Sequence, residues 1–313
     1  MVWIVGAGPL AIEYSKVLDS LRIKYSVIGR GKKSANKFRL ATGHYAFTGG
    51  LLNFLKTKPV IARKAIVAVN IEDLKDTTTK LINYGIKNIL LEKPGGLNFQ
   101  QVEDLNILAK RKKVNINVAY NRRFYSSTLK AKDLIYRDGG IQSFNFEFTE
   151  WIHSIEKLKK SKKVLKNWFF ANSTHVVDLA FYLGGMPKDM SSYVSKKILW
   201  NNSKAIFSGS GETTRGAMFS YSANWKSAGR WSIELLSAKG KYILRPLEQL
   251  FFQKKGSLEI KEIKLINNFD KKFKPGFYEQ IRAFLSNKKD DGLLSLTEHH
   301  NMISVYKKIL NDN

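Results

Sequence analysis

Two ionisable side chains in this 313-residue chain occupy positions where they could act on a bound ligand. The first is Lys93, which follows an apolar run at 88–91 and precedes Pro94. Proline disfavours helical geometry for the residue before it, so Lys93 should be presented at a strand end instead of being wound into the next helix. A lysine in such a place is most often a solvent-exposed terminator, but it could also hydrogen-bond or polarise a substrate oxygen.

The second candidate is His175, at the start of a helical pattern that runs from about 173 to 182. An imidazole titrates near neutrality, which suits general acid or base catalysis. The alternative is a structural histidine that caps or packs the helix, with Asp178 one turn later as its partner. The adjacent His299 and His300 would point in different directions on a helix, so we predict no metal site.

A glycine-rich turn follows the first apolar run, Val2 to Val5. It reads Gly6-Ala7-Gly8-Pro9-Leu10-Ala11, a G-x-G-x-x-A pattern between a predicted strand and a predicted helix. In this context glycines allow a tight turn and a close approach to a pyrophosphate, and the helix N-terminus supplies free N–H groups. We therefore predict a dinucleotide cofactor; the alternative is a purely structural turn.

The residues after the second predicted strand indicate which dinucleotide is bound. NAD enzymes usually place an acid there for the ribose hydroxyls, but no aspartate or glutamate lies between Asp19 and Glu72. The run "VIGRGKKSANK" offers cations for a 2′-phosphate, so we predict NADP(H) in preference to NAD(H). The alternative is a set of solvated lysines in a lysine-rich protein. The predicted cofactor residues are Gly6, Gly8, Pro9, Leu10, Arg30, Lys32, Lys33, Ser34, Asn70 and Glu92.

The elements that must position these residues change in character near residue 121. Before it, short β-branched runs alternate with amphipathic segments, which predicts an α/β Rossmann domain with a parallel sheet over 1–120. The strands are expected at 2–5, 25–28, 65–69, 88–91 and 115–119. After it, consecutive alternating runs from Lys204 to Leu265 predict an α+β domain over 121–313 with a large, mostly antiparallel open sheet. The C-terminal helices could pack back on the first domain.

Three stretches together resemble the Gfo/Idh/MocA oxidoreductases (glucose–fructose oxidoreductase, inositol dehydrogenase, rhizopine catabolism). They are the glycine turn, "EKP" at 92–94 and "VAYNRRFYSSTLKAKDLI" from Val118. The resemblance covers most of the chain and implies that Lys93 contacts the reacting hydroxyl or carbonyl and that His175 is the second catalytic residue. It also places Ala171 where the family has an acid four residues before the histidine. Either His175 alone moves the proton, or the chemistry differs from simple alcohol oxidation.

The same resemblance implies a sugar or cyclitol substrate, and a basic surface favours an anionic one such as a nucleotide-linked sugar, on a route to a surface glycan. The residues expected to contact substrate are Tyr120, Arg122, Trp168, Asn172 and Asp178. The alternative function is a nucleotide-binding sensor or scaffold without redox turnover, which Ala171 keeps open.

The composition of the chain limits the classes of partner that it is expected to bind. Its formal net charge is +27, but only 12 of the 53 basic residues are arginine and the lysines are scattered, so we predict no nucleic-acid partner. No apolar run is long enough to span a bilayer, and the chain has no cysteine, which agrees with a cytoplasmic protein without a membrane partner.

A homodimer or homotetramer is expected through an apolar sheet face with outward Phe219, Tyr221, Trp225 and Trp231.

Overall fold

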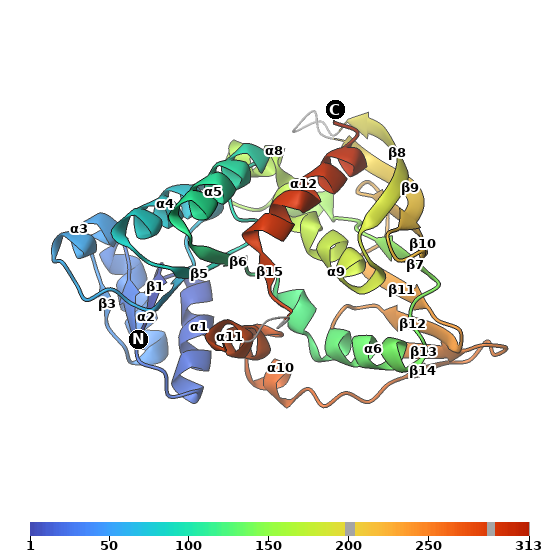
Figure 1. Ribbon diagram of the computed structural model, residues 1–313, viewed down its shortest axis with the longest axis horizontal. Helices are drawn as coiled ribbons and strands as arrows, with labels where there is room; N and C mark the ends of the chain where they lie inside the picture. The colour runs from blue at the N-terminus through green and yellow to red at the C-terminus, as the bar shows by residue number, and fades with distance from the viewer. Residues whose placement is uncertain (198–203, 287–291, 313) are drawn as a thin grey trace. The chain divides into compact units, whose positions relative to one another are not determined.

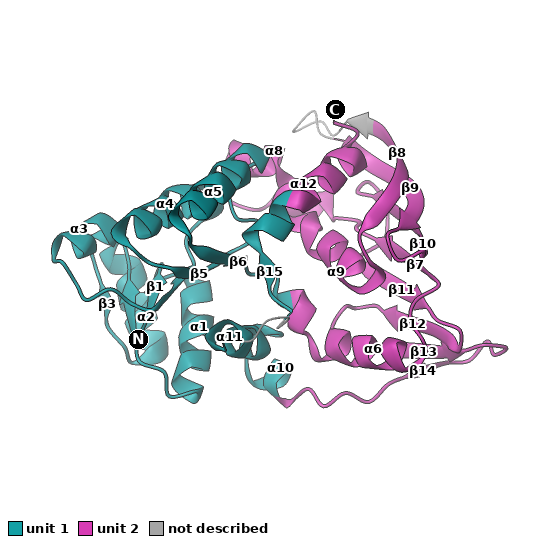
Figure 2. Ribbon diagram, in the orientation of Figure 1, with its two compact units in different colours: residues 1–121, 269–300 teal, residues 122–268, 301–313 magenta. Residues whose placement is uncertain are grey.

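The chain folds into two compact units. The computed structural model describes residues 1–197, 204–286 and 292–312. Unit 1 comprises residues 1–121 and 269–300, and unit 2 comprises residues 122–268 and 301–313 (Figure 2). Each unit has its own sheet and its own hydrophobic core, so the two are described in turn.

Unit 1 is built on a parallel sheet. Its strand order is β15-β6-β5-β4-β1-β2-β3, and among these pairs only β15 with β6 is antiparallel. The order reverses between β1 and β4, and in open α/β sheets ligands bind outside the carboxyl ends of the strands at such a point. The strands are β1 (Val2–Val5), β2 (Tyr25–Ile28), β3 (Ala46–Phe47), β4 (Lys64–Val67), β5 (Asn88–Leu91), β6 (Asn115–Val118) and β15 (Leu294–Ser295).

Helices cover both faces of this sheet: α3, α4 and α5 lie on one face and α1 and α11 on the other (Figure 1). The helices of unit 1 are α1 (Pro9–Ser20), α2 (Lys32–Thr42), α3 (Gly50–Lys56), α4 (Leu74–Tyr84), α5 (Phe99–Lys112), α10 (Asn268–Lys272) and α11 (Phe277–Leu285), with a short 3₁₀ turn η1 (Ile71–Asp73). A second 3₁₀ turn, η2 (Asn121–Phe124), begins at the last residue of this part of unit 1 and continues into unit 2. Helix α2 is not predicted by the sequence pattern, because its first residues are basic and fit a phosphate-binding loop equally well.

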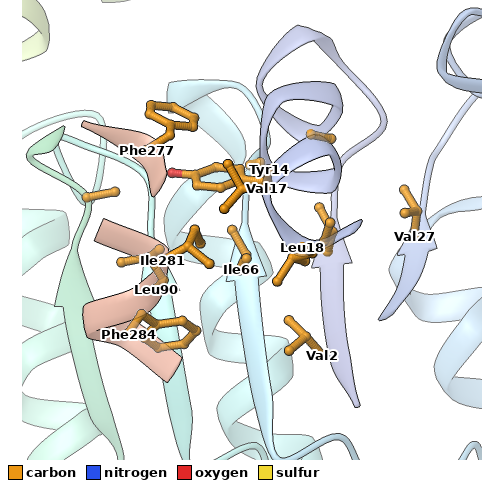
Figure 3. Close-up of a cluster of buried hydrophobic side chains, with 14 of the residues drawn as sticks. Val2, Tyr14, Val17, Leu18, Val27, Ile66, Leu90, Phe277, Ile281 and Phe284 are labelled. Atoms are coloured by element: carbon orange, nitrogen blue, oxygen red, sulfur yellow. The ribbon is translucent and has the colours of Figure 1, made fainter. Parts of the chain in front are cut away.

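The core of unit 1 joins segments far apart in the sequence. Figure 3 shows α1 and α11 side by side over the sheet, with Leu18 and Ile281 directed at Ile66 of β4; all three side chains are fully buried. The ring of Tyr14 stacks on that of Phe277 with centroids 4.7 Å apart. Burying a large aliphatic side chain stabilises the fold by roughly 1.5–3 kcal/mol. This packing holds Tyr14 firmly on the inner face of α1.

Unit 2 is built on an eight-stranded sheet of order β14-β13-β12-β11-β7-β10-β9-β8, in which only β7 and β10 pair in parallel. The strands are β7 (Ser143–Glu147), β8 (Pro187–Lys197), β9 (Lys204–Thr213), β10 (Met218–Asn224), β11 (Ser232–Leu236), β12 (Gly240–Leu244), β13 (Phe251–Lys254) and β14 (Ile260–Glu262). The fold class predicted from the sequence, a Rossmann domain followed by an α+β domain with a mostly antiparallel sheet, is confirmed.

The helical elements of unit 2 include one π-helical turn directly before a long buried helix. They are α6 (Ser126–Arg137), α7 (Ile152–Ile155), α8 (Lys162–Lys166), the π-helix η3 (Phe169–Ser173) and α9 (Thr174–Gly184). Helix α12 (Leu296–Leu310) begins in unit 1 and ends in unit 2. The lysine-rich stretch 156–166 contains α8, which is anchored by the buried Val164.

The aromatic side chains of the large sheet correct one expectation. Phe219, Tyr221, Trp225 and Trp231 are only 3–6% exposed, so the prediction that they form an outward apolar face is wrong. Phe219 packs edge-on against Phe181 of α9, with ring centroids 5.2 Å apart. Alternation along a strand separates its residues into two faces, but it does not show which of the two faces a helix covers.

The opposite face of that sheet carries both polar and apolar side chains where β10 crosses it, and Met218 is exposed there. Ser222 and Tyr193 are exposed there, and Ser220 is partly so. An apolar dimer surface made by the four aromatic residues is therefore absent, and the expected homodimer loses that support. No helix in the described residues is long and apolar enough to cross a membrane.

Candidate functional site

The glycine turn of unit 1 has the geometry that a dinucleotide needs. Gly6 has φ +119°, and a Cβ there would lie 2.2 Å from the carbonyl oxygen of Ala68, so a side chain is excluded by the neighbouring strand end. Gly8 precedes α1 as its N-cap, and a Cβ there would meet nothing within 4 Å. Pro9 opens the helix and the N–H groups of Leu10 and Ala11 follow it. The turn thus leaves open space over a helix N-terminus, which suits a pyrophosphate.

A cavity of about 740 Å³ opens beside this turn at the ends of β1, β2 and β4. Six of the predicted cofactor residues line it: Gly6, Gly8, Arg30, Lys33, Ser34 and Asn70. Lys32 is exposed and does not line the cavity, and neither do Pro9, Leu10 and Glu92. The residues of this chain therefore fit a dinucleotide at the switch point of the sheet.

The charge of this cavity is mixed. Lys37 and Lys80 add to the predicted cations, but Asp73 and Asp76 also line it, and Arg30 Nη1 lies 3.6 Å from Asp73 Oδ2. These four residues were not predicted from the sequence, because they come from the body of α2 and from η1 and α4, where no local pattern marks them.

The Glu92 carboxylate beside Lys93 is buried and anchored. Glu92 is 6% exposed, and the hydroxyl of Tyr14 donates to its Oε1 at 2.6 Å. Burial raises the pKa of Glu92, although the bond from Tyr14 and the charge of Lys93 act against that rise. Burial and the nearby carboxylate also raise the pKa of Tyr14. Glu92 was predicted to contact cofactor, whereas this geometry has it fix the strand end that carries Lys93.

A second anchor lies on the other side of Lys93. The Lys93–Pro94 peptide is cis, and the carbonyl oxygen of Pro94 lies 2.8 Å from His299 Nε2. A carbonyl can only accept, so this nitrogen carries the hydrogen. His299 is fully buried, and its ring centroid is 5.4 Å from that of Tyr120, one of the predicted substrate residues. Lys93, itself half-buried, is thus held between two hydrogen bonds from distant segments.

In unit 2, His175 is the second residue of α9 and is 4% exposed. Its ring centroid lies 6.0 Å from that of Trp231. The π-helix η3, which contains Ala171 and Asn172, leads directly into α9. Such π turns are rare and occur often at functional sites.

A carboxylate that the sequence analysis missed lies at this turn. Glu150 is 1% exposed, and it accepts hydrogen bonds from Asn172 Nδ2 at 3.0 Å and Ser173 Oγ at 2.8 Å. Burial raises the pKa of Glu150, although these bonds and Arg230 act against that rise. An acid is thus present beside the first turn of α9, although residue 171 is alanine. No spacing rule could find it, since it reaches η3 from the segment after β7.

The remaining predicted substrate residues separate into two groups. Arg123 donates to both oxygens of Asp178, at 2.6 and 2.8 Å, and the carboxylate is 1% exposed at its side chain. We therefore assign Asp178 a structural role instead of the predicted contact with substrate. Trp168 is buried next to η3, and the guanidinium of Arg122 lies 4.7 Å from the ring centroid of Trp231.

Among the described residues, no group of His, Asp and Glu side chains could hold a metal ion.

Comparisons with known proteins match the fold but not the sequence. No family model matches the chain, and no curated protein does. Among solved structures, a UDP-N-acetylglucosamine 3-dehydrogenase from Acidithiobacillus ferrooxidans is 11% identical with a TM-score of 0.75, covering 99% of this chain and 96% of its own. An NAD-binding oxidoreductase from Klebsiella pneumoniae is 15% identical with a TM-score of 0.77, covering 99% and 95%.

A third solved structure, a dehydrogenase from Clostridium difficile, is 19% identical with a TM-score of 0.77 and covers 100% of this chain and 99% of its own. All three matches extend over both units, so the likeness is to the whole two-unit architecture and not to a Rossmann domain alone. The chain therefore has the fold of the Gfo/Idh/MocA oxidoreductases, which its motifs resemble.

Proposed function

We propose that this protein is an NADP(H)-dependent oxidoreductase that acts on a hydroxyl or carbonyl carbon of a sugar-like substrate. The observation that carries the proposal is the cavity beside Gly6 and Gly8, at the switch point of a parallel sheet. Solved proteins of the same fold include an NAD-binding oxidoreductase and a nucleotide-sugar dehydrogenase.

The preference for NADP(H) is supported by the cations of the cavity. Arg30, Lys33 and Ser34 lie around the start of α2, whose N-terminus adds its own positive end. A 2′-phosphate there would gain charge-assisted hydrogen bonds. Asp73 and Asp76 oppose this preference, since they could instead accept from ribose hydroxyls.

In the proposed reaction, the bound nicotinamide supplies the hydride transfer. Lys93 hydrogen-bonds the substrate oxygen and stabilises negative charge that develops on it. His175 donates or accepts the proton of that oxygen. Glu92, Tyr14 and His299 hold the Lys93 segment in place, which limits the reorganisation needed at the moment of reaction.

The substrate is proposed to be a sugar or a nucleotide-linked sugar, and the pathway to be surface-glycan synthesis in the cytoplasm. The basic surface supports an anionic substrate, because it raises the local concentration of anions. A homodimer or homotetramer remains part of the proposal on the resemblance alone.

Turnover with a panel of substrates tests the proposal. The purified protein is mixed with NADPH or NADP⁺ and a series of sugars and nucleotide sugars, and the absorbance of the reduced nicotinamide is followed. We expect turnover that Lys93→Ala abolishes and that Lys112→Ala, an exposed lysine at the end of α5, leaves unchanged. Turnover that survives Lys93→Ala would contradict the assigned role of the lysine.

A nucleotide-binding sensor or scaffold is the second candidate, because Ala171 removes the acid that the resemblance leads one to expect. It predicts tight binding of NADPH without turnover on any substrate of the panel. Glu150, which lies against the same turn, weakens this candidate, since the site keeps a carboxylate.

A further inference from the structure

Unit 2 contains a cavity of about 610 Å³ that the proposed redox chemistry does not use. It is lined by Trp151 and His153, at the start of the short helix α7, and by Trp225 and Lys226, directly after β10. Its volume falls within the range of roughly 300–1,000 Å³ that is usual for small-molecule sites. All of its lining residues belong to unit 2, so it differs from the cavity beside the glycine turn. We call it the Trp151 cavity.

The indole of Trp151 is exposed to solvent but held in place. The residue is 44% exposed, and its Nε1 donates to the carbonyl oxygen of Gly229 at 2.7 Å. The guanidinium carbon of Arg230 lies 4.8 Å from the ring centroid. A side chain that is already fixed loses little conformational freedom when a ligand binds to it. Trp151 therefore provides a rigid aromatic surface at the edge of the cavity.

A second aromatic ring lies beside this surface. The centroid of the His153 ring is 6.2 Å from that of Trp151, and the two ring planes differ by only 22°. The bases of nucleotides stack on such side chains, and every base has a π face that can do so. A flat heteroaromatic ring fits two nearly parallel rings better than a puckered sugar ring does.

The cavity also offers one side chain of each charge. Lys226 and Glu156 both line it and are exposed, and neither forms an ion pair with another residue that the structure describes. A lysine binds a phosphate as a point charge, and a carboxylate accepts from the N–H groups at the edge of a base. A partner for a phosphate is thus present beside the stacking surface.

The Trp151 cavity adjoins the turn that precedes the proposed proton donor. Trp151 directly follows Glu150, whose carboxylate accepts from Asn172 and Ser173. Ser173 is the N-cap of α9, the helix that contains His175. A ligand with a base at one end and a sugar at the other can therefore occupy the cavity and extend toward α9.

We propose that the Trp151 cavity binds the base of a nucleotide-linked sugar, with Trp151 as the stacking surface and Lys226 as the partner of the adjoining phosphate. The inference rests on the proposed function, which it deepens by naming the part of the substrate that is bound away from the reacting carbon. Binding energy from such a remote group helps to orient the reacting carbon.

Binding of substrate fragments to the full-length protein tests the inference without cofactor or turnover. Titration calorimetry is recorded with UMP, GMP, uridine and ribose 5-phosphate, which has the sugar and the phosphate but no base. We expect UMP or GMP to bind at least roughly fivefold more tightly than ribose 5-phosphate, because stacking of a base on an aromatic side chain contributes a factor of about that size or more. In saturation-transfer NMR, the protons of the base should receive the strongest signal.

Variants of the stacking residue locate the bound base. Trp151→Leu should remove most of the advantage of the nucleotide over ribose 5-phosphate, while Trp151→Phe should keep part of it. Tyr136→Leu, on an exposed aromatic residue of α6, is the matched control and should change nothing. Arg30→Met, in the cofactor cavity of unit 1, should also leave the affinity for UMP and GMP unchanged.

A lysine variant tests the phosphate partner. Lys226→Gln should reduce the advantage of UMP over uridine, because the amide carries no charge. Lys255→Gln, on another exposed lysine of unit 2, is its control. Circular dichroism confirms that each variant is folded.

Three results would overturn the inference. They are binding of UMP and GMP no tighter than that of ribose 5-phosphate, no measurable binding of either nucleotide, and an unchanged nucleotide affinity in folded Trp151→Leu. Failure of the redox proposal is read separately, since UMP or GMP can bind to a protein that oxidises and reduces nothing. Conversely, turnover of free sugars without nucleotide binding would leave the redox proposal standing and reject the base site.

Discussion

Glu92 is a buried carboxylate one residue from the proposed catalytic lysine, and its main anchor is a single hydroxyl. Tyr14 reaches it from α1, and Tyr14 is itself fixed by its stack on Phe277. A buried acid whose pKa is raised binds its proton more tightly in the folded chain than in the unfolded chain. The stability of unit 1 must therefore depend on pH through this residue.

The sign of that dependence is fixed by the direction of the shift. Above the ordinary carboxyl pKa of 4.5, the unfolded chain loses the proton first, so the free energy of unfolding falls as the pH rises. We expect Glu92→Gln, which cannot ionise, to abolish this contribution. Urea unfolding from about pH 5 to about pH 8 should show the wild type losing stability relative to Glu92→Gln until the folded carboxyl has ionised.

Comparison of pH slopes, and not of absolute stabilities, is the informative measurement, because the amide also changes the bond to Tyr14. Tyr14→Phe serves as the companion variant. It removes the donor that favours the ionised form, so the pKa of Glu92 should rise further and the loss of stability should extend to higher pH. Parallel slopes for the wild type and Glu92→Gln would show that this carboxyl does not govern the dependence.

At the scale of elements, the turn between β1 and α1 contains two glycines, and each is needed there for a different physical reason. Gly6 has a positive φ and faces the end of β4, whereas Gly8 faces open space. We expect Gly6→Ala to destabilise the fold by about 1–3 kcal/mol, because the Cβ would clash with backbone and the φ is strained. Gly8→Ala should keep the fold and weaken cofactor binding, since the methyl group enters the space where backbone approaches the pyrophosphate.

Thermal unfolding and NADPH titration of the two variants provide the measurement. The informative pattern is a lower Tm for Gly6→Ala and a near wild-type Tm with a higher Kd for Gly8→Ala. If Gly8→Ala bound NADPH as tightly as the wild type, the pyrophosphate would not lie over this turn.

The local sequence pattern was sufficient to predict most helices and strands. It failed where tertiary contacts decide the structure of a segment or the face that is buried. Short β-branched runs located β1, β2 and β5 to the residue. Helix α2 was missed, because its basic start fits a phosphate-binding loop equally well. The face occupied by Phe219 was predicted wrongly, because parity along a strand does not reveal which face a helix covers.

The residues of the candidate site also fall into two groups, those that a local motif predicts and those that only tertiary contacts bring to the site. The glycine turn and the E-K-P run are contiguous and carry their chemistry in their spacing. Tyr14, His299 and Glu150 act through contacts of 78, 205 and 22 to 23 residues in separation, and a single sequence carries no signal for such pairs.

At the scale of the whole molecule, a formal charge of +27 should make anion binding depend on salt. NADPH carries one more phosphate than NADH, and the proposed 2′-phosphate pocket has four cations and two carboxylates around it. We expect NADPH affinity to fall more steeply than NADH affinity between about 0.05 and about 0.5 M KCl, because screening acts on the additional charge.

Fluorescence titration of both cofactors across that range is the measurement. Arg30→Met should bring the two salt slopes together, while Lys32→Met, on a side chain that does not line the cavity, should leave them apart. Identical slopes in the wild type would indicate that the 2′-phosphate is not bound among these cations, and would favour NAD(H).

The carboxylate of Glu150 has a consequence for how relatives of this protein are found. A motif search that requires an acid four residues before the helix histidine passes over this chain, because that position is Ala171. Glu150 contacts the same turn from another part of the fold, through Asn172 and Ser173. We therefore expect an evolutionary exchange between the two positions: lineages with a small residue at 171 should retain an acid at 150, and those with the motif acid should be free to lose it. A paired search of this kind would recover a branch that single-motif searches omit.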